Sequence, residues 1–523
     1  LWNKGYDGIP IVKGDKYDFS LFTRLSSSNK GGKLLVQLID EKDVVIAEKT
    51  IKKPTNQWKK QSLVLVAKES SKAAKLRITP QSEGIYNLDM ISLFPQKTFK
   101  GRKNGLRQDL AQVLADIQPR FVRFPGGCLA HGDGLDNMYR WKNTVGPLES
   151  RKHQRNIWGY HQSAGVGYYE FFQFCEDLNA EPVPVVPAGV PCQNSSTGGA
   201  GQQGGIPMCE MDDYVQEVLD LIEWANGDKS TKWGRVRAEA GHPEPFNLKY
   251  IGVGNEDLIT HIFEERFEMI FKAVKEKHPE IIVIGTVGPF SEGSDYVEGW
   301  RFATELEIPI VDEHYYQPPG WYIHNQDYYD RYDRNKSKVY LGEYAAHLPG
   351  RRNNIETALA EALHMNNVER NGDIVSMTSY APLLAKDGYT QWNPDLIYFN
   401  NEEVKLTTGY YVQKMFGENA GNQYLPSKVV LSDTNESVQK RFSVSVVKDE
   451  VSGDYIVKLV NLLPVSIESE LQIPEVNLSG VTATCSVLHG KPDDRDAKPQ
   501  TKTISGIDKV TLPAYSFTVL RFK

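Results

Sequence analysis

The chain has 523 residues, of which 40% are hydrophobic and 24% charged, and a formal net charge of −7, as is ordinary for a globular chain of about three domains. Positive and negative residues are interspersed, so there is no basic stripe of the kind that binds nucleic-acid phosphates, and nucleic acid is excluded as the expected partner. No stretch approaches the roughly 18 consecutive apolar residues of a membrane-spanning helix.

Both ends of the chain are predicted to be β-sandwiches. Residues 1–96 alternate apolar and polar side chains with the period of two that is typical of strands, and residues 419–523 do the same. The alternating positions are Tyr17, Phe19 and Leu21, then Leu76 and Ile78, and near the other end Phe442, Val444, Val446, Tyr515, Phe517 and Val519. The first sandwich resembles a carbohydrate-binding module.

The central part, residues 97–418, changes to a helical period. Leu106, Leu110, Val113 and Ile117 have helical spacing and lead directly into an apolar strand. Helices and strands then alternate, which predicts α/β architecture with a parallel sheet closed as a (β/α)8 TIM barrel. The predicted strands are 119–124, 182–189, 249–255, 281–287, 308–314, 338–343 and 374–380.

The predicted barrel has one strand too few. The helix over 106–117 has no barrel strand directly before it, so the seven strands are expected to be the second to the eighth. A sheet left open would have unpaired backbone groups at both edges. We therefore expect the missing first strand to come from residues outside this sequence, which starts at Leu1 without an initiator methionine.

Two glutamates follow apolar strands at matching positions. Glu256 follows the predicted fourth barrel strand and Glu343 the seventh, and the loops after such strands converge at the catalytic end of a barrel. A single glutamate at the end of a strand is usually part of a structural ion pair. Two of them facing each other across the barrel mouth favour the carboxylate pair of a retaining glycosidase, in which one attacks the anomeric carbon and the other protonates the leaving oxygen.

This chemistry needs no cofactor, and no metal site is predicted. The segment Ala130–Asn137 contains histidine and aspartate, but it lacks the spacing and the terminal glutamate of a calcium-binding loop, so a polar loop is the better interpretation. The five cysteines are scattered along the chain and form neither a disulfide framework nor a CxxC metal pattern. They leave the cellular compartment undecided.

Several motifs together resemble the α-L-arabinofuranosidases of glycoside hydrolase family fifty-one. The resemblance covers nearly the whole chain, and the combination is specific although each motif alone would be weak. The motifs are Arg123-Phe124-Pro125-Gly126-Gly127-Cys128, Tyr139-Arg140-Trp141-Lys142, Val145-Gly146-Pro147-Leu148-Glu149-Ser150-Arg151, Gly254-Asn255-Glu256, Asp312-Glu313-His314-Tyr315-Tyr316 and Leu341-Gly342-Glu343-Tyr344.

The resemblance implies that Glu256 is the acid/base and Glu343 the nucleophile. Asn255 would bind the sugar hydroxyl next to the anomeric carbon, an interaction that strengthens in the transition state, and its alternative is a strand-end cap. Arg123 would hold Glu343 ionised, because a nearby guanidinium lowers the pKa of a carboxylate. Its alternative role is that of a surface residue.

Four further residues are implied to line the sugar pocket. His314 and Tyr316 share one face of a strand, and a structural pair is the equal alternative. Cys128 would be a small polarisable contact rather than a nucleophile, and Trp141 would be a stacking wall. Either of these two could instead belong to the core.

The expected function is retaining, exo-acting removal of arabinofuranosyl groups from arabinan, arabinoxylan or their oligosaccharides. These glycans are the expected partners, nucleic acid and a membrane span are not expected, and a homo-oligomer is compatible with the sequence. A periplasmic or secreted location is favoured over a cytoplasmic one. Two alternatives stay open. One is an endo-acting barrel glycosidase such as an endoglucanase or xylanase, which an open groove lined by tryptophans would indicate. The other is a non-catalytic glycan-binding protein.

Overall fold

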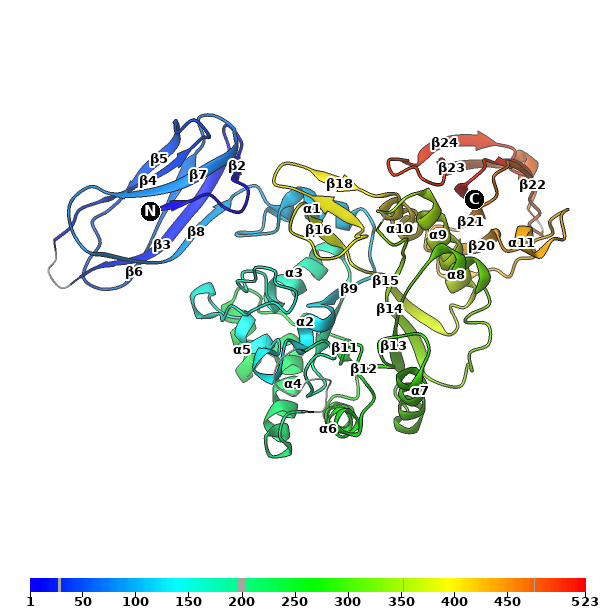
Figure 1. Cartoon of the computed structure of the whole chain (residues 1–523), viewed down its shortest axis with the longest axis horizontal. Helices are drawn as coiled ribbons and strands as arrows, with labels where there is room; N and C mark the ends of the chain where they lie inside the picture. The colour runs from blue at the N-terminus through cyan, green and yellow to red at the C-terminus, as the bar shows by residue number, and fades with distance from the viewer. Residues whose placement is uncertain (27–29, 196–203, 351, 475) are drawn as a thin grey trace. The chain divides into compact units, whose positions relative to one another are not determined.

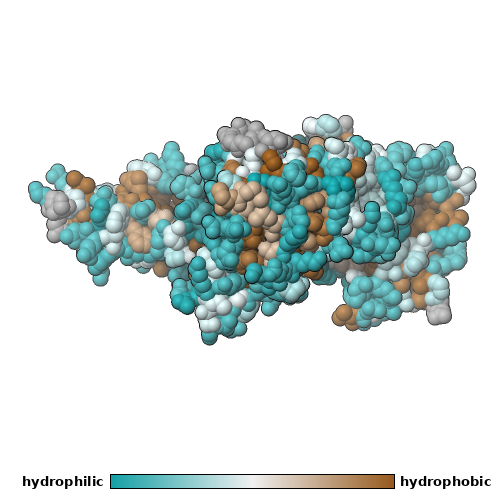
Figure 2. Space-filling view, turned by 90° about the horizontal axis from the view of Figure 1, so that it is seen from below, coloured by the Kyte–Doolittle hydropathy of each residue, from teal (hydrophilic) through white to brown (hydrophobic). Residues whose placement is uncertain are grey.

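The computed structural model describes residues 1–26, 30–195, 204–350, 352–474 and 476–523. These divide into two compact units, one made of residues 1–116 with 399–405 and the other of residues 117–398 with 406–523 (Figure 1). The visible surface is mostly hydrophilic, with apolar residues in separate patches (Figure 2). No helix among the described residues is long and apolar enough to cross a membrane.

The first unit contains a sandwich of two sheets. One has the order β1-β7-β4-β5, with β2 also paired to β7, and the other has the order β6-β3-β8. The inward residues of the alternating pattern, Phe19, Leu21, Leu76 and Ile78, are buried in one shared core. The strands are β1 (Trp2–Asn3), β2 (Ile9–Ile11), β3 (Lys16–Leu25), β4 (Leu34–Ile39), β5 (Val45–Ile51), β6 (Lys59–Val66), β7 (Ser71–Pro80) and β8 (Tyr86–Pro95), and helix α1 (Gln108–Ala115) follows them.

The second unit is built on a near-closed parallel barrel sheet, which confirms the predicted fold class. Its seven strands run in the order β15-β14-β13-β12-β11-β10-β9, so neighbours in sequence are neighbours in the sheet. Val183, Ile284, Ile310 and Tyr340 from four of these strands form one cluster, which is how the interior of such a barrel is filled. The strands are β9 (Phe121–Phe124), β10 (Glu181–Val186), β11 (Tyr250–Val253), β12 (Ile282–Thr286), β13 (Ile310–Gln317), β14 (Lys338–Ala346) and β15 (Val375–Tyr380).

Helices separate the barrel strands because the sequence between them has the helical period. In α4, for example, Val218, Leu219 and Ile222 pack into the large aromatic core under the helices, and the helix ends at Asn226, directly before Gly227. The helices of this unit are α2 (Gly127–His131), α3 (Tyr168–Leu178), α4 (Met211–Asn226), α5 (Lys232–Glu239), α6 (His261–Lys277), α7 (Ser294–Leu306), α8 (Pro319–His324), α9 (Ile355–Arg370), α10 (Thr408–Glu418) and α11 (Glu436–Gln439). A small sheet of β16 (Leu384–Lys386), β17 (Ile397–Phe399) and β18 (Val404–Leu406) precedes α10.

The carboxy-terminal residues form the second predicted sandwich. A sheet of order β19-β20-β21-β26-β23-β24 encloses an apolar core together with the pair β22-β25. The strands are β19 (Gln423–Tyr424), β20 (Phe442–Asp449), β21 (Asp454–Asn461), β22 (Ile467–Glu470), β23 (Thr482–His489), β24 (Gln500–Ser505), β25 (Lys509–Leu512) and β26 (Ser516–Phe522).

The polar face of β20 and β21 is also buried, because α9 packs on it. Asn366 of α9 donates to Ser443, and Glu369 of α9 accepts from Ser445 at 2.5 Å. The ammonium group of Lys458, which is fully buried, lies 2.5 Å from Glu369. A buried charge is stable only with such a partner. The contact with α9 therefore accounts for the serines and the lysine on this buried face.

We expect Glu369→Ala to lower the free energy of unfolding by about 3–5 kcal/mol, because it leaves the Lys458 ammonium buried without its partner. The matched control is Glu436→Ala, which breaks the exposed pair with Lys440 on α11 and should have little effect. Urea unfolding followed by circular dichroism measures both variants. Equal, small effects would contradict a stabilising role for the buried pair.

Candidate active site

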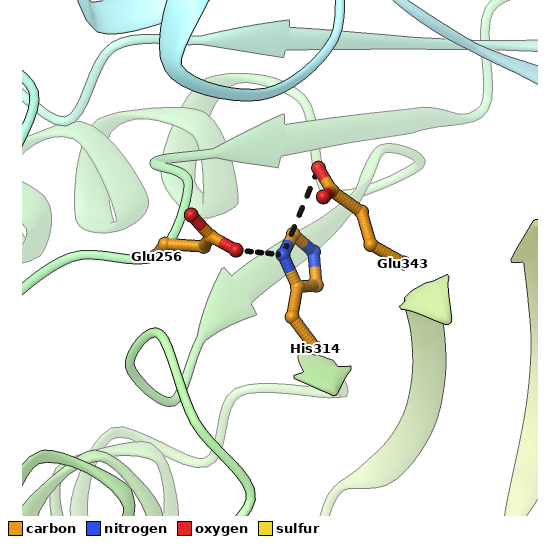
Figure 3. Close-up of side chains that lie close together, drawn as sticks. All are labelled: Glu256, His314 and Glu343. Carbon is orange, nitrogen blue, oxygen red and sulfur yellow. Dashed lines mark hydrogen bonds and ion pairs between the residues drawn. The ribbon is translucent and has the colours of Figure 1, made fainter. Parts of the chain in front are cut away.

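All of the predicted site residues except Trp141 meet at the carboxyl ends of four barrel strands. Parallel strands present these ends on one side of the barrel, where the loops that follow them converge. Arg123 comes from β9 and Glu343 from β14, whereas Asn255 and Glu256 directly follow β11. His314 of β13 lies between the two glutamates (Figure 3).

Both carboxylate oxygens of Glu343 accept hydrogen bonds. Arg123 donates from Nη1 to Oε1 at 2.9 Å, and the Tyr316 hydroxyl donates to Oε2 at 2.6 Å. Burial by itself raises the pKa of Glu343, but the charges of His314 and Arg123 and the hydrogen bond from Tyr316 outweigh it and lower the pKa below its ordinary value. This carboxylate is therefore ionised at neutral pH, as a nucleophile must be.

Glu256 lies on a turn with unusual backbone geometry. Its φ is +51° and that of Gly254 is +88°, and a non-glycine residue in this region is strained unless its surroundings hold it there. Its Oε1 lies 3.0 Å from Nδ1 of His314, and its Oε2 accepts a hydrogen bond from Nε2 of Gln193 at 2.9 Å. The side chain is 16% exposed, so the carboxyl group is fixed in place and still open to solvent.

His314 supplies a positive charge between the carboxylates. Burial lowers its pKa, but the charges of Asp312 and Glu343 more than compensate and raise it to about 10. The imidazole is thus protonated at neutral pH, with Nε2 3.0 Å from Asp312 and Nδ1 3.7 Å from Glu343. Together with the Arg123 guanidinium it offsets the charges of three closely spaced carboxylates.

Glu256, His314 and Glu343 also have the residue types of a metal site. One ligand atom from each lies within 4.8 Å of the others. The Arg123 guanidinium, 2.9 Å from Glu343, and the protonated His314 already supply positive charge there, and a bound cation would be repelled by both. The arrangement fits carboxylate chemistry better than metal binding.

A glycine before Glu343 allows this close packing. A Cβ atom on Gly342 would lie 1.9 Å from Oδ1 of Asp312, whereas one on Gly127 would lie 3.4 Å from Oε1 of Glu343, which is an ordinary contact. No side chain fits at the first position without displacing Asp312. The glycine before the nucleophile candidate is therefore required by the neighbouring strand.

Asn255 has a free donor in the site. Its Oδ1 accepts from Nη2 of Arg123 at 2.5 Å, which turns its Nδ2 away from the guanidinium. The residue is fully buried, and Nδ2 has no hydrogen-bond partner among the described residues. Because a buried donor without a partner is costly, this amide is suited to bind an acceptor on a ligand.

The structure adds residues to which the sequence interpretation gave no role. Asp312 lies on the same face of β13 as His314, and the spacing of two in the motif already carried that signal. His131 and Asp257 form a buried pair, with Nε2 and Oδ1 3.1 Å apart, and Oδ2 of Asp257 accepts a hydrogen bond from the backbone N–H of Asn255 at 2.9 Å. His131, the last residue of α2, thus supports the turn that carries Glu256. Gln193 had no signal in the sequence, because it contacts Glu256 across two neighbouring loops that are 63 residues apart along the chain.

Cys128 lies beside the candidate acid/base. Its Sγ is 4.0 Å from Oε2 of Glu256 and 3.5 Å from Nδ2 of Asn194. Hydrogen bonding with the Cys192 thiol and burial both raise the pKa of Cys128. A thiol of this kind is a poor nucleophile, in keeping with its interpretation as a contact residue.

Trp141 lies elsewhere than expected. Its ring is only 2% exposed and packs against Trp224 and Trp233, and its indole N–H donates to the Glu217 carbonyl of α4 at 2.9 Å. The interpretation of Trp141 as a stacking wall is therefore corrected to its alternative, a core residue. An apolar aromatic side chain next to a motif cannot be assigned to a pocket or a core without knowing which helices cover it.

Comparison with known proteins gives consistent matches. Residues 113–334 match the α-L-arabinofuranosidase 1 domain, and residues 322–516 match the α-L-arabinofuranosidase C-terminal domain. An extracellular exo-α-L-arabinofuranosidase of Streptomyces chartreusis is 40% identical over 82% of this chain, and the chain spans 51% of that protein's length. α-L-Arabinofuranosidase A of Aspergillus kawachii is 30% identical over 99% of the chain and 81% of its own length.

A solved structure extends the likeness to three dimensions. An arabinose-bound α-L-arabinofuranosidase of glycoside hydrolase family 51 has 32% identity to this chain and a TM-score of 0.88, and the alignment covers 100% of this chain and 84% of the other. The matched ranges include all of the residues that meet at the strand ends.

We expect Tyr316→Phe to lower kcat/KM by about 10- to 100-fold, because the variant removes a hydrogen bond to the ionised Glu343. The lost donor also raises the pKa of Glu343, so the acidic limb of the kcat/KM profile should move to higher pH. Tyr214→Phe is the matched control, since its hydroxyl donates to the Pro187 carbonyl instead of a carboxylate. An acidic limb that stays in place in Tyr316→Phe would contradict this role.

Proposed function

The chain belongs to the α-L-arabinofuranosidases of glycoside hydrolase family 51, and we propose that it hydrolyses α-L-arabinofuranosyl groups at the non-reducing ends of arabinan, arabinoxylan or their oligosaccharides. The observation that carries the proposal is the pair of carboxylates, Glu256 and Glu343, whose oxygens lie within 4.8 Å of each other. Retaining glycosidases hold their two carboxyl groups about 5–5.5 Å apart, whereas inverting enzymes leave room for a water at about 6.5–9.5 Å.

In the proposed first step the Glu343 carboxylate attacks the anomeric carbon. The bond from that carbon to the leaving oxygen breaks as Glu256 donates a proton to the oxygen, and an ester links the sugar to Glu343. The amide of Asn255 donates to the hydroxyl next to the anomeric carbon and stabilises the charge that develops on the ring. Arg123 fixes both the amide and the nucleophile, through the two ends of its guanidinium.

In the second step Glu256 acts as a base. It removes a proton from water, the water oxygen bonds to the anomeric carbon, and the Glu343 carboxylate leaves. His314 stays protonated through both steps and keeps the two carboxylates in place. Cys128, His314 and Tyr316 are assigned to the wall of the pocket.

We assign this chemistry to residues 97–418 and treat the sandwiches of 1–96 and 419–523 as outside the reacting centre. The amino-terminal sandwich has exposed tryptophans, with Trp2 53% and Trp58 44% exposed. Arg77 lies 5.5 Å from the ring centroid of Trp2, and Arg24 lies 5.1 Å from that of Trp58. Exposed aromatic rings suit contact with a polymer, so glycan contact is retained as the role of this sandwich.

Glu343→Ala should abolish hydrolysis of an aryl α-L-arabinofuranoside, because the group that forms the glycosyl-enzyme is gone. Circular dichroism and the thermal midpoint should stay close to those of the unmodified protein. Turnover near the original rate would eliminate the nucleophile assignment. A folded, unmodified chain that cannot cleave this substrate would instead favour a glycan-binding protein or an endo-acting glycosidase.

Glu256→Ala should slow turnover in a different way. A good aryl leaving group needs little protonation, so the glycosyl-enzyme still forms but cannot be hydrolysed without the base. Added azide needs no base and should raise the rate and yield the glycosyl azide with retained configuration. Glu343→Ala is the matched control, in which azide should produce no retained product. Absence of rescue in folded Glu256→Ala would count against the acid/base assignment.

A further inference from the structure

Gln193 connects the candidate acid/base to a pair of thiols. Its Nε2 lies 2.9 Å from Oε2 of Glu256, and its Oε1 lies 3.1 Å from Sγ of Cys192 and 4.0 Å from Sγ of Cys128. Gln193 follows β10, whereas Glu256 follows β11. The amide therefore joins two neighbouring loops of the barrel mouth at the reacting centre.

The chemistry of the neighbours fixes the orientation of this amide. A carboxylate only accepts hydrogen bonds, so the end of Gln193 that faces Glu256 must be the NH2 group. Asn194 donates its backbone N–H to Sγ of Cys192 at 3.4 Å and its side-chain amide to Sγ of Cys128 at 3.5 Å. Both sulfurs thus have donors already, and the S–H of Cys192 is left to donate to Oε1 of Gln193.

We infer that Gln193 is a positioning residue that stabilises the ionised form of Glu256 and sets the upper pH limit of activity, and that the Cys192 thiol holds its amide in the required orientation. The inference rests on the proposed acid/base role of Glu256. In the first step Glu256 must carry a proton and in the second it must lack one, so a donor aimed at its carboxylate shifts the balance between the two steps. This gives Gln193 an effect on pH dependence that packing alone would not have.

Other groups around Glu256 also act on the protonation equilibrium of its carboxyl group. Their effects have to be distinguished from that of Gln193. The protonated His314 of β13 favours the ionised carboxylate, and Glu343 of β14 opposes it. Cys128 of α2 and Tyr316 of β13 are neutral contacts at neutral pH, because the pKa of each is raised. Arg123 and Asp312 face the same site and are paired with each other at 3.6 Å, and Asp257 is paired with His131. Cys192 is a further titratable neighbour, and hydrogen bonding from Cys128 lowers its pKa.

The test is the pH profile of kcat/KM for Gln193→Leu. A leucine has similar size and no donor, so the basic limb, which reports loss of the proton from the general acid, should move up by about one pH unit. The acidic limb, which reports Glu343, should not move. Gln216→Leu is the matched control, because it removes an amide that donates to Asp220 of α4 at 2.9 Å, away from Glu256, and should leave both limbs in place.

Two variants of Cys192 distinguish the effect of the Gln193 amide on the basic limb from the effect of the Cys192 thiol. Cys192→Ser keeps a donor that does not ionise in this range and should retain the original basic limb. Cys192→Ala loses the donor and should move the limb in the same direction as Gln193→Leu, but less. The inference is overturned if Gln193→Leu lowers activity without moving the limb, or if both Cys192 variants move it and Gln193→Leu does not.

Failure of this inference is distinguishable from failure of the proposed function. If azide rescues Glu256→Ala but Gln193→Leu leaves the basic limb unchanged, the acid/base assignment of Glu256 is supported and the role inferred for Gln193 is wrong. If azide does not rescue folded Glu256→Ala, the acid/base assignment itself is wrong. Thermal midpoints of all variants show whether a loss of activity reflects folding.

Discussion

The site depends on the balance of charge at the barrel mouth. Carboxylate oxygens of Glu256 and Glu343 lie within 4.8 Å of each other, and Glu256 and Asp312 each lie 3.0 Å from the His314 ring. Carboxylates this close would repel strongly in a partly buried setting. Arg123 and the protonated His314 make that arrangement possible, with contacts of 2.9 Å from Arg123 to Glu343 and 3.0 Å from His314 to Asp312. Loss of either cation would change the ionisation of the others.

The barrel supplies the positions from which these charges act. Its parallel strands end on one side, so residues more than two hundred positions apart, such as Arg123 and Glu343, meet without long connecting loops. The absence of a side chain at Gly342 lets β14 approach the Asp312 carboxylate closely. The buried pair of His131 and Asp257 holds the backbone amide of Asn255, and this support keeps Glu256 on its strained turn.

The two carboxyl groups of the proposed pair have different surroundings. Glu343 accepts hydrogen bonds from an arginine and a tyrosine and lies near an imidazolium, all of which favour its ionised form. Glu256 shares the same imidazolium but is otherwise approached by the amide of Gln193 and the thiol of Cys128. One carboxyl group thus has two cations beside it, and the other has one cation and neutral donors.

The order of elements, the barrel and the strand ends that carry Glu256 and Glu343 could be predicted from the amino-acid sequence. These follow from local periodicity, because a side-chain period of two or of 3.6 records which face of a strand or helix is buried. The family motifs added residue roles beyond what periodicity could give. The same reasoning predicted that His314 and Tyr316 share a face, since both lie on one strand.

Which side chains are in contact could be seen only in the folded structure. Trp141 lies in the core because α4 and α5 cover it. The sequence motif around Trp141 does not indicate that these helices pack on it. The polar face of β20 is buried because α9 packs on it. The alternation of apolar and polar residues in β20 is nevertheless typical of a strand with one face exposed to solvent. Gln193 reaches Glu256 because two loops converge at the barrel mouth. Such contacts join residues far apart in the chain, and no local pattern in the sequence can encode the distance between them.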